Sequence, residues 1–330
     1  MGIVQVARQA GVSITTVSRV FNAPKTVAEA TRAAVQEAAN AQAYLPNATA
    51  ATLRTQRSRA LGVLLPTLLN PVFAECLAGI AQAAADAGYA IIPLTTSYDE
   101  AQEAHAVRQL MQRAVDGVIL TVANAAYSAT LKALKRDQLP YVLAYNRHPR
   151  HPCVSVNGEA AMVELIEHLQ RSGHSRITMV CGTLEASDRA QQRHAGYTAA
   201  MQRAGLSAEC IEVPFVESAV DVITARLRLK RLPTALVCSN DLLAVRCLRA
   251  AALAGLRVPA DISVVGFDGI ALGADLTPSL ASIAQPNQEL GRSSAAWLIG
   301  CLLEGVPPKP RASLTLPHTL LLRESVAAVH

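Results

Sequence analysis

VARQAGVSITTVSRVFN, residues 6–22, has the residue spacing of two short helices joined by a tight turn. The first helix would bury apolar residues that recur three and four positions apart, namely Ile3, Val6, Ala7 and Ala10. Gly11 suits the turn, and Ser13 suits the N-cap of a second helix. Two helices joined in this way predict a helix-turn-helix arrangement.

The second helix would have two different faces. Val17, Val20 and Phe21 would face a core. The opposite stripe is polar and consists of Thr15, Ser18, Arg19 and Asn22. Hydroxyl, amide and guanidinium groups suit base edges and phosphates in the DNA major groove. The spacing alone also fits a small helical bundle that binds nothing.

A third helix is predicted from about Ala28 to Gln42, with Ala34, Val35 and Ala38 turned inward. Ala28 cannot cap this helix with its side chain, which costs roughly 1 kcal/mol, so we expect the start of the helix to fray.

The excess positive charge lies at the N-terminus. Residues 1–59 hold seven Lys and Arg against two Glu, whereas the rest of the chain has 23 basic and 23 acidic residues. This distribution is typical of a nucleic-acid-binding segment joined to a neutral domain, although a solvated basic face has the same charge.

From Ala60 onward, short apolar runs alternate with helical stretches such as FAECLAGIAQAAADAG. The runs ALGVLLP, YAIIPL, VDGVILT and PYVLAY predict strands of a doubly wound parallel sheet. An offset of 117 residues relates Ala78-Gly79-Ile80 to Ala195-Gly196-Tyr197, and weakly VDGVIL to LPTALV. The repeat predicts two similar lobes with a ligand cleft between them, although two lobes without a ligand would show it too.

Several segments together resemble the lactose-repressor (LacI/GalR) family of bacterial transcription regulators. They cover nearly the whole chain in order: residues 6–22, TRAAVQEAANAQAYLPNATAATLR (31–54), ALGVLLPTLLNPVFAECLAGI (60–80), GYTAAM (196–201), CSNDLLA (238–244), GLRVPADISVVGFD (255–268) and LLLRES (320–325).

The resemblance implies an N-terminal all-α helix-turn-helix DNA-binding domain and an α/β core of two doubly wound parallel-sheet lobes, similar to periplasmic binding proteins. The expected boundaries are 1–45 for the DNA-binding domain, 46–58 for a hinge-helix linker and 59–330 for the effector-binding and dimerisation core. Within that core, the N-lobe would span about 59–156 and 285–314, and the C-lobe about 157–284 and 315–330.

The resemblance also implies residue roles in the DNA-binding domain. Ile14, Thr15 and Arg19 would contact operator bases, and the apolar Ile14 would meet a thymine methyl group. Phosphates would be held by Ser13, Thr16, Ser18 and Asn22.

YLPNATAATLRTQRS, residues 44–58, predicts a helix that forms only when another molecule stabilises it. Pro46 ends the third helix and Asn47 can cap a new one. A helix of about two turns has only marginal stability in water unless DNA or a partner subunit orders it. The resemblance implies a hinge helix that lies in the minor groove, with Asn47 at its start and Leu53 as a wedge between base pairs. Arg54 and Arg57 would then meet phosphates or the groove floor. Leu53 could instead pack on the core as an ordinary linker residue.

Polar and aromatic residues gather at the predicted strand ends and match the family's effector site: Asn70, Phe73, Tyr145, Asn146, Arg147, Arg193, Asn240, Asp241, Asp268 and Gln285. Such groups suit a hydroxyl-rich small molecule. For Asp241 and Gln285, a capping or structural bond fits as well as a ligand contact.

One position departs from the family pattern. Many members have aspartate where this chain has Asn146, and Arg147, Arg189 and Arg193 are expected nearby. The cleft should therefore be more cationic, which favours an anionic sugar such as an aldonate or a sugar phosphate. Trp297, the single tryptophan, lies in an apolar helix, which argues against an indole platform for a purine.

The resemblance implies a ligand-responsive transcription regulator of a carbohydrate or sugar-acid catabolic operon. Repression is the usual output of the family, and activation is the alternative. The regulator would act as a homodimer on a near-palindromic operator, without a leucine heptad tail for tetramers. Neither a secretory signal nor a membrane-spanning run is evident, so we expect a cytoplasmic, nucleoid-associated protein. A transport binding protein with the same lobes would need an export signal and no helix-turn-helix.

We predict neither catalytic activity nor a cofactor, since common hydrolase, metalloprotease and phosphate-loop motifs are missing from the sequence. Asp188 or His194 near the cleft could in principle carry out acid–base chemistry.

His148, His151 and Cys153 could form a metal site, but a polar loop is the expected interpretation. The seven scattered cysteines favour reduced thiols.

Overall fold

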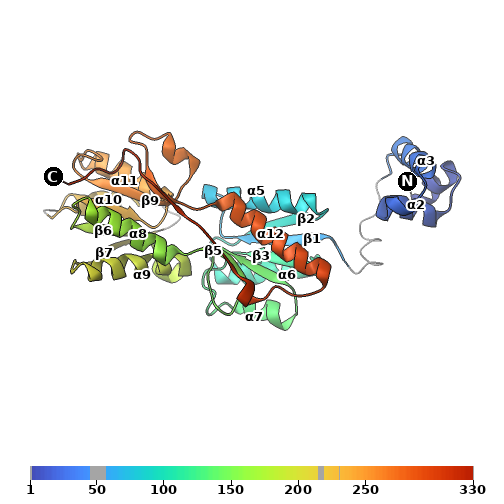
Figure 1. The fold of residues 1–330 in the computed structure, drawn as a ribbon, viewed down its shortest axis with the longest axis horizontal. Helices are drawn as coiled ribbons and strands as arrows, with labels where there is room; N and C mark the ends of the chain where they lie inside the picture. Colours follow the sequence, from blue (N-terminus) through green and yellow to red (C-terminus); the bar gives the residue numbers. More distant parts are fainter. Residues whose placement is uncertain (1, 45–56, 215–218, 230, 330) are drawn as a thin grey trace. The chain divides into compact units, whose positions relative to one another are not determined.

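The computed structural model describes residues 2–44, 57–214, 219–229 and 231–329. The chain divides into two compact units, residues 1–58 and 59–330 (Figure 1). No helix within these described ranges is long and apolar enough to cross a membrane.

The first unit is the predicted helix-turn-helix. Its helices are α1 (Ile3–Gln9), α2 (Ile14–Asn22) and α3 (Glu29–Ala41), with a 3₁₀ turn at Pro24–Thr26. One small core holds them together and consists of Val6, Ala7, Val17, Val20, Val35, Ala38 and Ala39. The prediction that Ala34 faces inward is wrong, because Ala34 is exposed and Ala39 completes the buried i, i+3, i+4 stripe instead. Ala28 precedes α3 without a side-chain cap, as predicted.

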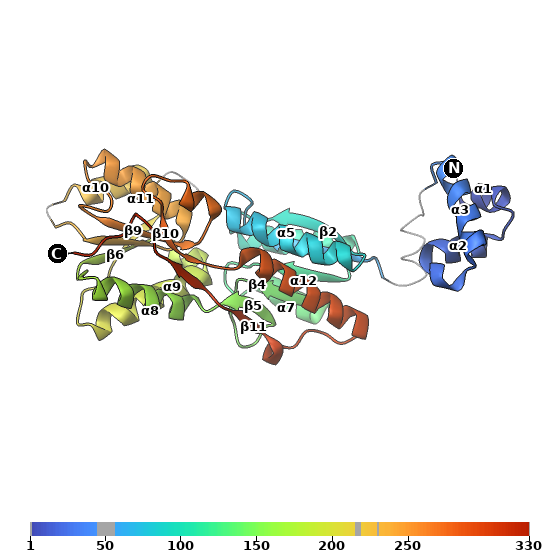
Figure 2. The same cartoon turned by 45° about the horizontal axis from the view of Figure 1, so that its top comes forward.

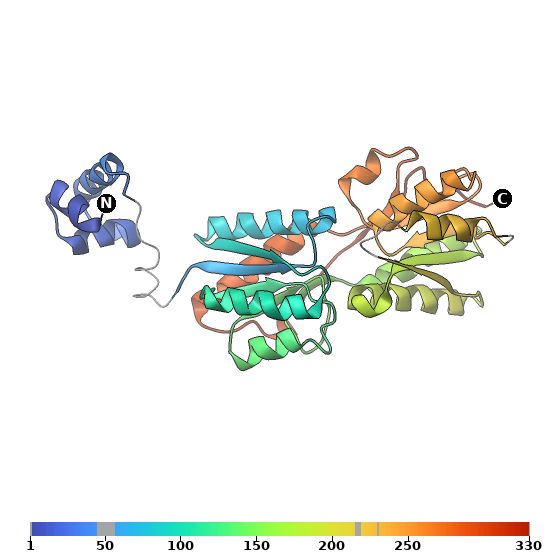
Figure 3. The ribbon, with the colours of Figure 1, turned by 180° about the vertical axis from the view of Figure 1, so that it is seen from behind.

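The second unit begins with a six-stranded parallel sheet in the order β11-β5-β4-β3-β1-β2. Its strands are β1 (Ala60–Leu65), β2 (Ala90–Thr95), β3 (Gly117–Leu120), β4 (Tyr141–Ala144), β5 (Cys153–Val156) and β11 (Leu314–Leu316). Figure 2 shows α5 (Pro71–Asp86) beside α12 (Asn287–Glu304) on one face. Figure 3 shows the opposite side, where α6 (Glu100–Gln112) and α7 (Ala129–Arg136) cover the other face. The central strands are apolar throughout because both faces are buried.

A second sheet has the order β12-β10-β9-β8-β6-β7, and only its edge strand β12 runs antiparallel. Its strands are β6 (Ile177–Gly182), β7 (Glu209–Val213), β8 (Ala235–Cys238), β9 (Ser263–Asp268), β10 (Ala281–Ala284) and β12 (Thr319–Leu321). Its faces are covered by α8 (Gly158–Arg171), α9 (Asp188–Arg203), α10 (Val220–Leu227) and α11 (Asp241–Leu253). The predicted fold class is therefore confirmed.

The two lobes repeat each other with the offset seen in the sequence. β1 and β6 begin and end 117 residues apart, and so do α5 and α9. The chain passes between the lobes three times: between β5 and α8, between β10 and α12, and between β11 and β12. The last passage lies between Leu316 and Thr319, two residues beyond the expected boundary at 314/315.

Candidate effector site and DNA-binding surface

The first unit presents the polar stripe of α2 to solvent. Ile14 is 48% exposed, and Thr15 and Arg19 are also exposed. The hydroxyl of Ser13 caps α2 by accepting from the Thr16 amide at 3.1 Å and lies 2.9 Å from the Thr16 hydroxyl. Ser18 is half-buried on the same helix.

The remaining predicted DNA contacts are described less fully. Asn22 is the last residue of α2, and its side chain lies outside the described structure. Asn47, Leu53 and Arg54 also lie outside the described residues, whereas Arg57 is exposed.

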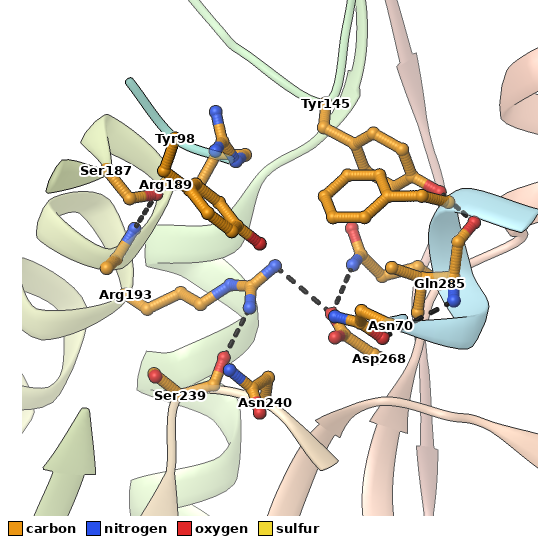
Figure 4. A pocket seen from close by; sticks show the side chains of 13 residues that line it. Asn70, Tyr98, Tyr145, Ser187, Arg189, Arg193, Ser239, Asn240, Asp268 and Gln285 are labelled. Carbon is orange, nitrogen blue, oxygen red and sulfur yellow. Dashed lines mark hydrogen bonds and ion pairs between the residues drawn. The ribbon is translucent and has the colours of Figure 1, made fainter. Parts of the chain in front are cut away.

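A pocket lies between the two lobes of the second unit (Figure 4). Seven predicted effector residues line it: Asn70, Phe73, Tyr145, Arg193, Asn240, Asp268 and Gln285. Parallel strands place their carboxyl ends at one edge of each sheet, which brings these distant residues together. Asn70 and Asn240 also cap α5 and α11, accepting from the amides of Val72 at 3.4 Å and Leu243 at 2.8 Å.

Asp268 and Arg193 form the polar centre of the pocket. Nη2 of Arg193 lies 3.3 Å from Oδ1 of Asp268, and Gln285 Nε2 donates to the same oxygen at 2.8 Å (Figure 4). Arg193 also donates to the Ser239 carbonyl and stacks over the Phe267 ring. Burial raises the pKa of Asp268, while Arg193, Asn70 and Gln285 oppose that rise by stabilising its carboxylate.

An aromatic pair forms the first-lobe side of the pocket. Phe73 and Tyr145 meet edge to face with ring centroids 5.4 Å apart. The Tyr145 hydroxyl donates to the Val72 carbonyl at 2.8 Å and lies 3.1 Å from Oδ1 of Asn287. Burial is the main cause that raises the Tyr145 pKa well above its ordinary value, so the phenol stays neutral.

Three predicted residues do not line the pocket. Asn146 is buried, and its amide donates to both carboxylate oxygens of Asp188, at 2.8 and 2.9 Å. Arg147 is exposed. Asp241 turns away from the pocket and accepts from the Ile270 amide at 2.7 Å and the Ser282 hydroxyl at 2.6 Å.

Other residues line the pocket although the sequence prediction did not include them as ligands: Val72, Tyr98, Ser187, Arg189, Ala190 and Ser239. The repeat contains a signal for three of them. Ser187, Arg189 and Ala190 lie 117 residues after Asn70, Val72 and Phe73, which line the pocket from the first lobe. Tyr98 lies in the loop after β2, and the burial of its hydroxyl raises its pKa to about 12.

A second cavity adjoins the pocket and shares Asn70, Tyr98 and Asn240 with it. Its additional lining includes Leu69, Leu242 and Leu243. Thr67, Ser97 and Arg246 complete this lining, so the region beside the pocket combines apolar and polar side chains.

The residues considered as alternative acid–base or metal sites include side chains that hydrogen-bond to other parts of the protein. Asp188 accepts from the Ala125 amide at 3.0 Å as well as from Asn146, and neither Asp188 nor His194 lines the pocket. Nδ1 of His151 lies 2.7 Å from the Tyr141 hydroxyl, and burial lowers the pKa of His151 to about 4. Among the described residues, no group of three or more His, Cys, Asp or Glu could hold a metal ion.

Comparison with known proteins connects both units to one family. Residues 3–47 match the family model "Bacterial regulatory proteins, lacI family", and residues 166–326 match a periplasmic binding protein-like domain. The chain is 32% identical to the HTH-type transcriptional repressor PurR of Photobacterium profundum over 98% of both proteins. The chain belongs to the LacI family.

Further relatives agree over the full length. The chain is 30% identical to the HTH-type transcriptional regulator DegA of Bacillus subtilis, over 99% of this chain and 98% of that protein. A crystal structure of the Lac repressor dimer bound to operator and the anti-inducer ONPF is 28% identical, covers 99% of both chains and has a TM-score of 0.87.

As a member of the LacI family, the protein is a ligand-responsive DNA-binding transcriptional repressor. Repressors of this family bind operator DNA and small-molecule effectors and act as dimers. The prediction that the chain is not an enzyme is confirmed by these relatives, which are transcription regulators.

Proposed function

We propose that this LacI-family protein is a homodimeric repressor of a carbohydrate or sugar-acid catabolic operon in the cytoplasm, where it is associated with the nucleoid. Its effector is a hydroxyl-rich small molecule, namely a sugar, a sugar acid or a sugar phosphate. The observation that carries the effector proposal is the pocket between the lobes, where Asp268, Arg193 and Gln285 gather beside the aromatic ring of Phe73. Carboxylate, guanidinium and carboxamide groups match the hydroxyls of a sugar, and an aromatic ring matches its C–H face.

Operator recognition is assigned to α2 and to the linker. Ile14, Thr15 and Arg19 contact bases in the major groove, while Ser13, Thr16, Ser18 and Asn22 lie near phosphates. The solvent exposure of Ile14, Thr15 and Arg19 supports this assignment. Residues 46–58 act as the hinge, with Leu53 as the minor-groove wedge and Asn47, Arg54 and Arg57 beside it.

The test is selection of bound genomic fragments by the purified protein, with and without cell extract as a source of effectors. We expect enrichment of a short palindrome. Arg19→Ala should weaken binding to that palindrome about 5- to 150-fold, because a base contact is worth roughly 1–3 kcal/mol. Arg203→Ala is the matched control, since Arg203 lies on α9 in the other unit and pairs with Glu167 at 3.0 Å.

Failure to enrich any fragment under either condition would contradict DNA recognition. Enrichment that survives Arg19→Ala unchanged would contradict the assignment of α2. The genes beside the enriched fragments test the proposed operon, because they would encode enzymes of carbohydrate or sugar-acid breakdown.

A further inference from the structure

We propose that the effector carries an anionic group, a carboxylate or a phosphate, and that Arg189 binds this group. The inference rests on the proposed function, because it takes the pocket between the lobes as the effector site. It narrows that function from sugars in general to their acids and phosphates.

Arg189 has a buried donor without an acceptor. Its side chain is 10% exposed and lines the pocket. Nη1 donates to the Val122 carbonyl at 2.7 Å and lies 3.3 Å from Oδ1 of Asp188. Nη2 is buried and has no hydrogen-bond partner among the described residues. A buried guanidinium nitrogen in this state is costly, so an acceptor supplied by a ligand is favourable.

The carboxylates near Arg189 leave its Nη2 without a partner, because Asp188 pairs with Nη1 at 3.3 Å. Asp268 interacts with Arg193 and Gln285. Asp188 accepts from the Asn146 amide and the Ala125 backbone, both in the first lobe. Arg189 is therefore the pocket cation that retains donor capacity, and an anionic acceptor gives it a stronger hydrogen bond than a neutral hydroxyl.

A further donor without a partner lies elsewhere in the same pocket. The hydroxyl of Ser239 lines the pocket and is also buried without a hydrogen-bond partner in the described part of the chain.

The internal repeat gives the pocket two unlike walls. The first lobe places Val72 and Phe73 at positions where the second lobe has Arg189 and Ala190. One turn further along α9, Arg193 occupies the position that Cys76 has in α5. A ligand would therefore direct its charged end toward α9 and its less polar face toward Phe73, which fits a sugar acid or a sugar phosphate.

The test compares matched probes on the full-length protein by thermal unfolding and calorimetric titration at constant ionic strength. D-gluconate and D-glucose 6-phosphate are the anionic probes, and sorbitol and D-glucose are the neutral ones. We expect an anionic probe to bind more tightly than its neutral counterpart. Arg189→Gln should weaken anion binding about 10- to 100-fold and remove the preference, since a charge-assisted hydrogen bond is lost.

Two variants control for folding and for general charge. Arg189→Lys keeps the charge and should retain part of the preference, whereas Arg203→Gln removes a charge from the exposed face of the same helix and should change nothing. Tighter binding of the neutral probes would overturn this inference and leave the carbohydrate effector of the proposed function intact. A preference for anions that persists in Arg189→Gln would overturn the role of Arg189. Absence of binding by all four probes would count against both proposals about the pocket, while fragment selection would still test DNA recognition separately.

Discussion

At the scale of single residues, Tyr145 and Asp268 have unusual backbone conformations. Their φ angles are 68° and 119°, in the left-handed region that side chains disfavour. Tyr145 follows β4 and Asp268 ends β9, the corresponding strands of the two lobes, and both residues line the pocket. Their hydrogen bonds to Val72 and Gln285 hold the strained conformations in place. Backbone strain of this kind concentrates at ligand sites, which supports the assignment of the pocket.

Glu103 gives a prediction about pH at the same scale. It is 1% exposed, and Oε1 accepts from the Ala123 amide at 2.7 Å. Burial raises its pKa from 4.5 to about 7, and the hydrogen bond from Ala123 opposes this rise. Because the folded-state pKa is the higher one, its contribution to stability is complete below about pH 4.5 and is lost as pH rises through about 7.

Glu103→Gln should therefore leave the unfolding free energy of the second unit nearly unchanged at pH 4.5 and increase it by roughly 2–3 kcal/mol at pH 8. Urea unfolding at the two pH values measures the difference. Glu304→Gln, at the exposed end of α12, is the control and should show no such change. An equal effect of Glu103→Gln at both pH values would contradict the prediction.

Three predicted pocket residues lie elsewhere because a position at the end of a strand does not determine the direction of its side chain. Tyr145, Asn146 and Arg147 follow one strand consecutively, but successive side chains point in different directions, so only Tyr145 reaches the pocket. Asp241 begins α11 and turns to Ile270 and Ser282. Strand ends identify the edge of a sheet from sequence, whereas side-chain direction depends on the backbone angles of each loop. The repeat could have identified Arg189 from the sequence, because Arg189 corresponds to Val72, which lies between the predicted Asn70 and Phe73.

At the scale of elements, the repeated glycines mark the closest helix packing in each lobe. An added Cβ at Gly79 would lie 1.9 Å from the Gln288 carbonyl oxygen of α12. An added Cβ at Gly196 would lie 2.3 Å from the Glu159 carbonyl oxygen of α8. Helical periodicity predicts α5 and α9 from sequence, and the matching glycines indicate that a second helix packs on each. The identity of α12 as the partner of α5 was not predictable from periodicity, because more than 200 residues separate Gly79 from Gln288.

Gly79→Ala and Gly196→Ala should each destabilise the second unit by roughly 1–3 kcal/mol, because the methyl group meets backbone that cannot move aside freely. Gly300→Ala is the matched control in α12, where an added Cβ has nothing within 4 Å. This control should gain up to about 1 kcal/mol from helix propensity. Thermal unfolding of the three variants tests the prediction, which fails if Gly300→Ala is as damaging as the other two.

At the scale of the second unit, one polar cluster connects the lobes beside the pocket. Asn146 and the loop of residues 122–125 belong to the first lobe, whereas Asp188 and Arg189 begin α9 in the second. The Asp188 amide donates to the Ala123 carbonyl at 2.9 Å, in addition to the side-chain bonds of Asp188 and Arg189 across the same interface. Because Arg189 also lines the pocket, a ligand bound there would act directly on the contact between the lobes.

Asn146→Asp tests this connection with almost no change in side-chain volume. The Asn146 amide donates to Asp188 and to the Val122 carbonyl at 2.9 Å, and a carboxylate can make neither bond. It would instead face the Asp188 carboxylate at hydrogen-bond distance, so the two lobes should separate more readily. We expect faster hydrogen exchange at the amides of residues 122–125 and a stability loss of roughly 1–3 kcal/mol at pH 8.

The loss should be smaller at low pH, where one protonated carboxyl can donate to the other. Asn157→Asp is the matched control, because Asn157 only accepts, from the Ala160 amide at 3.2 Å, and aspartate caps a helix equally well. If closure of the lobes is part of binding, Asn146→Asp should also change the affinity for the effector. The factor by which effector changes operator affinity should then differ from that in the parent protein. Unchanged exchange at residues 122–125 would mean that this cluster does not hold the lobes together. If the exchange rate changed but effector altered operator affinity by the same factor as in the parent protein, the contact between the lobes would have no part in repression.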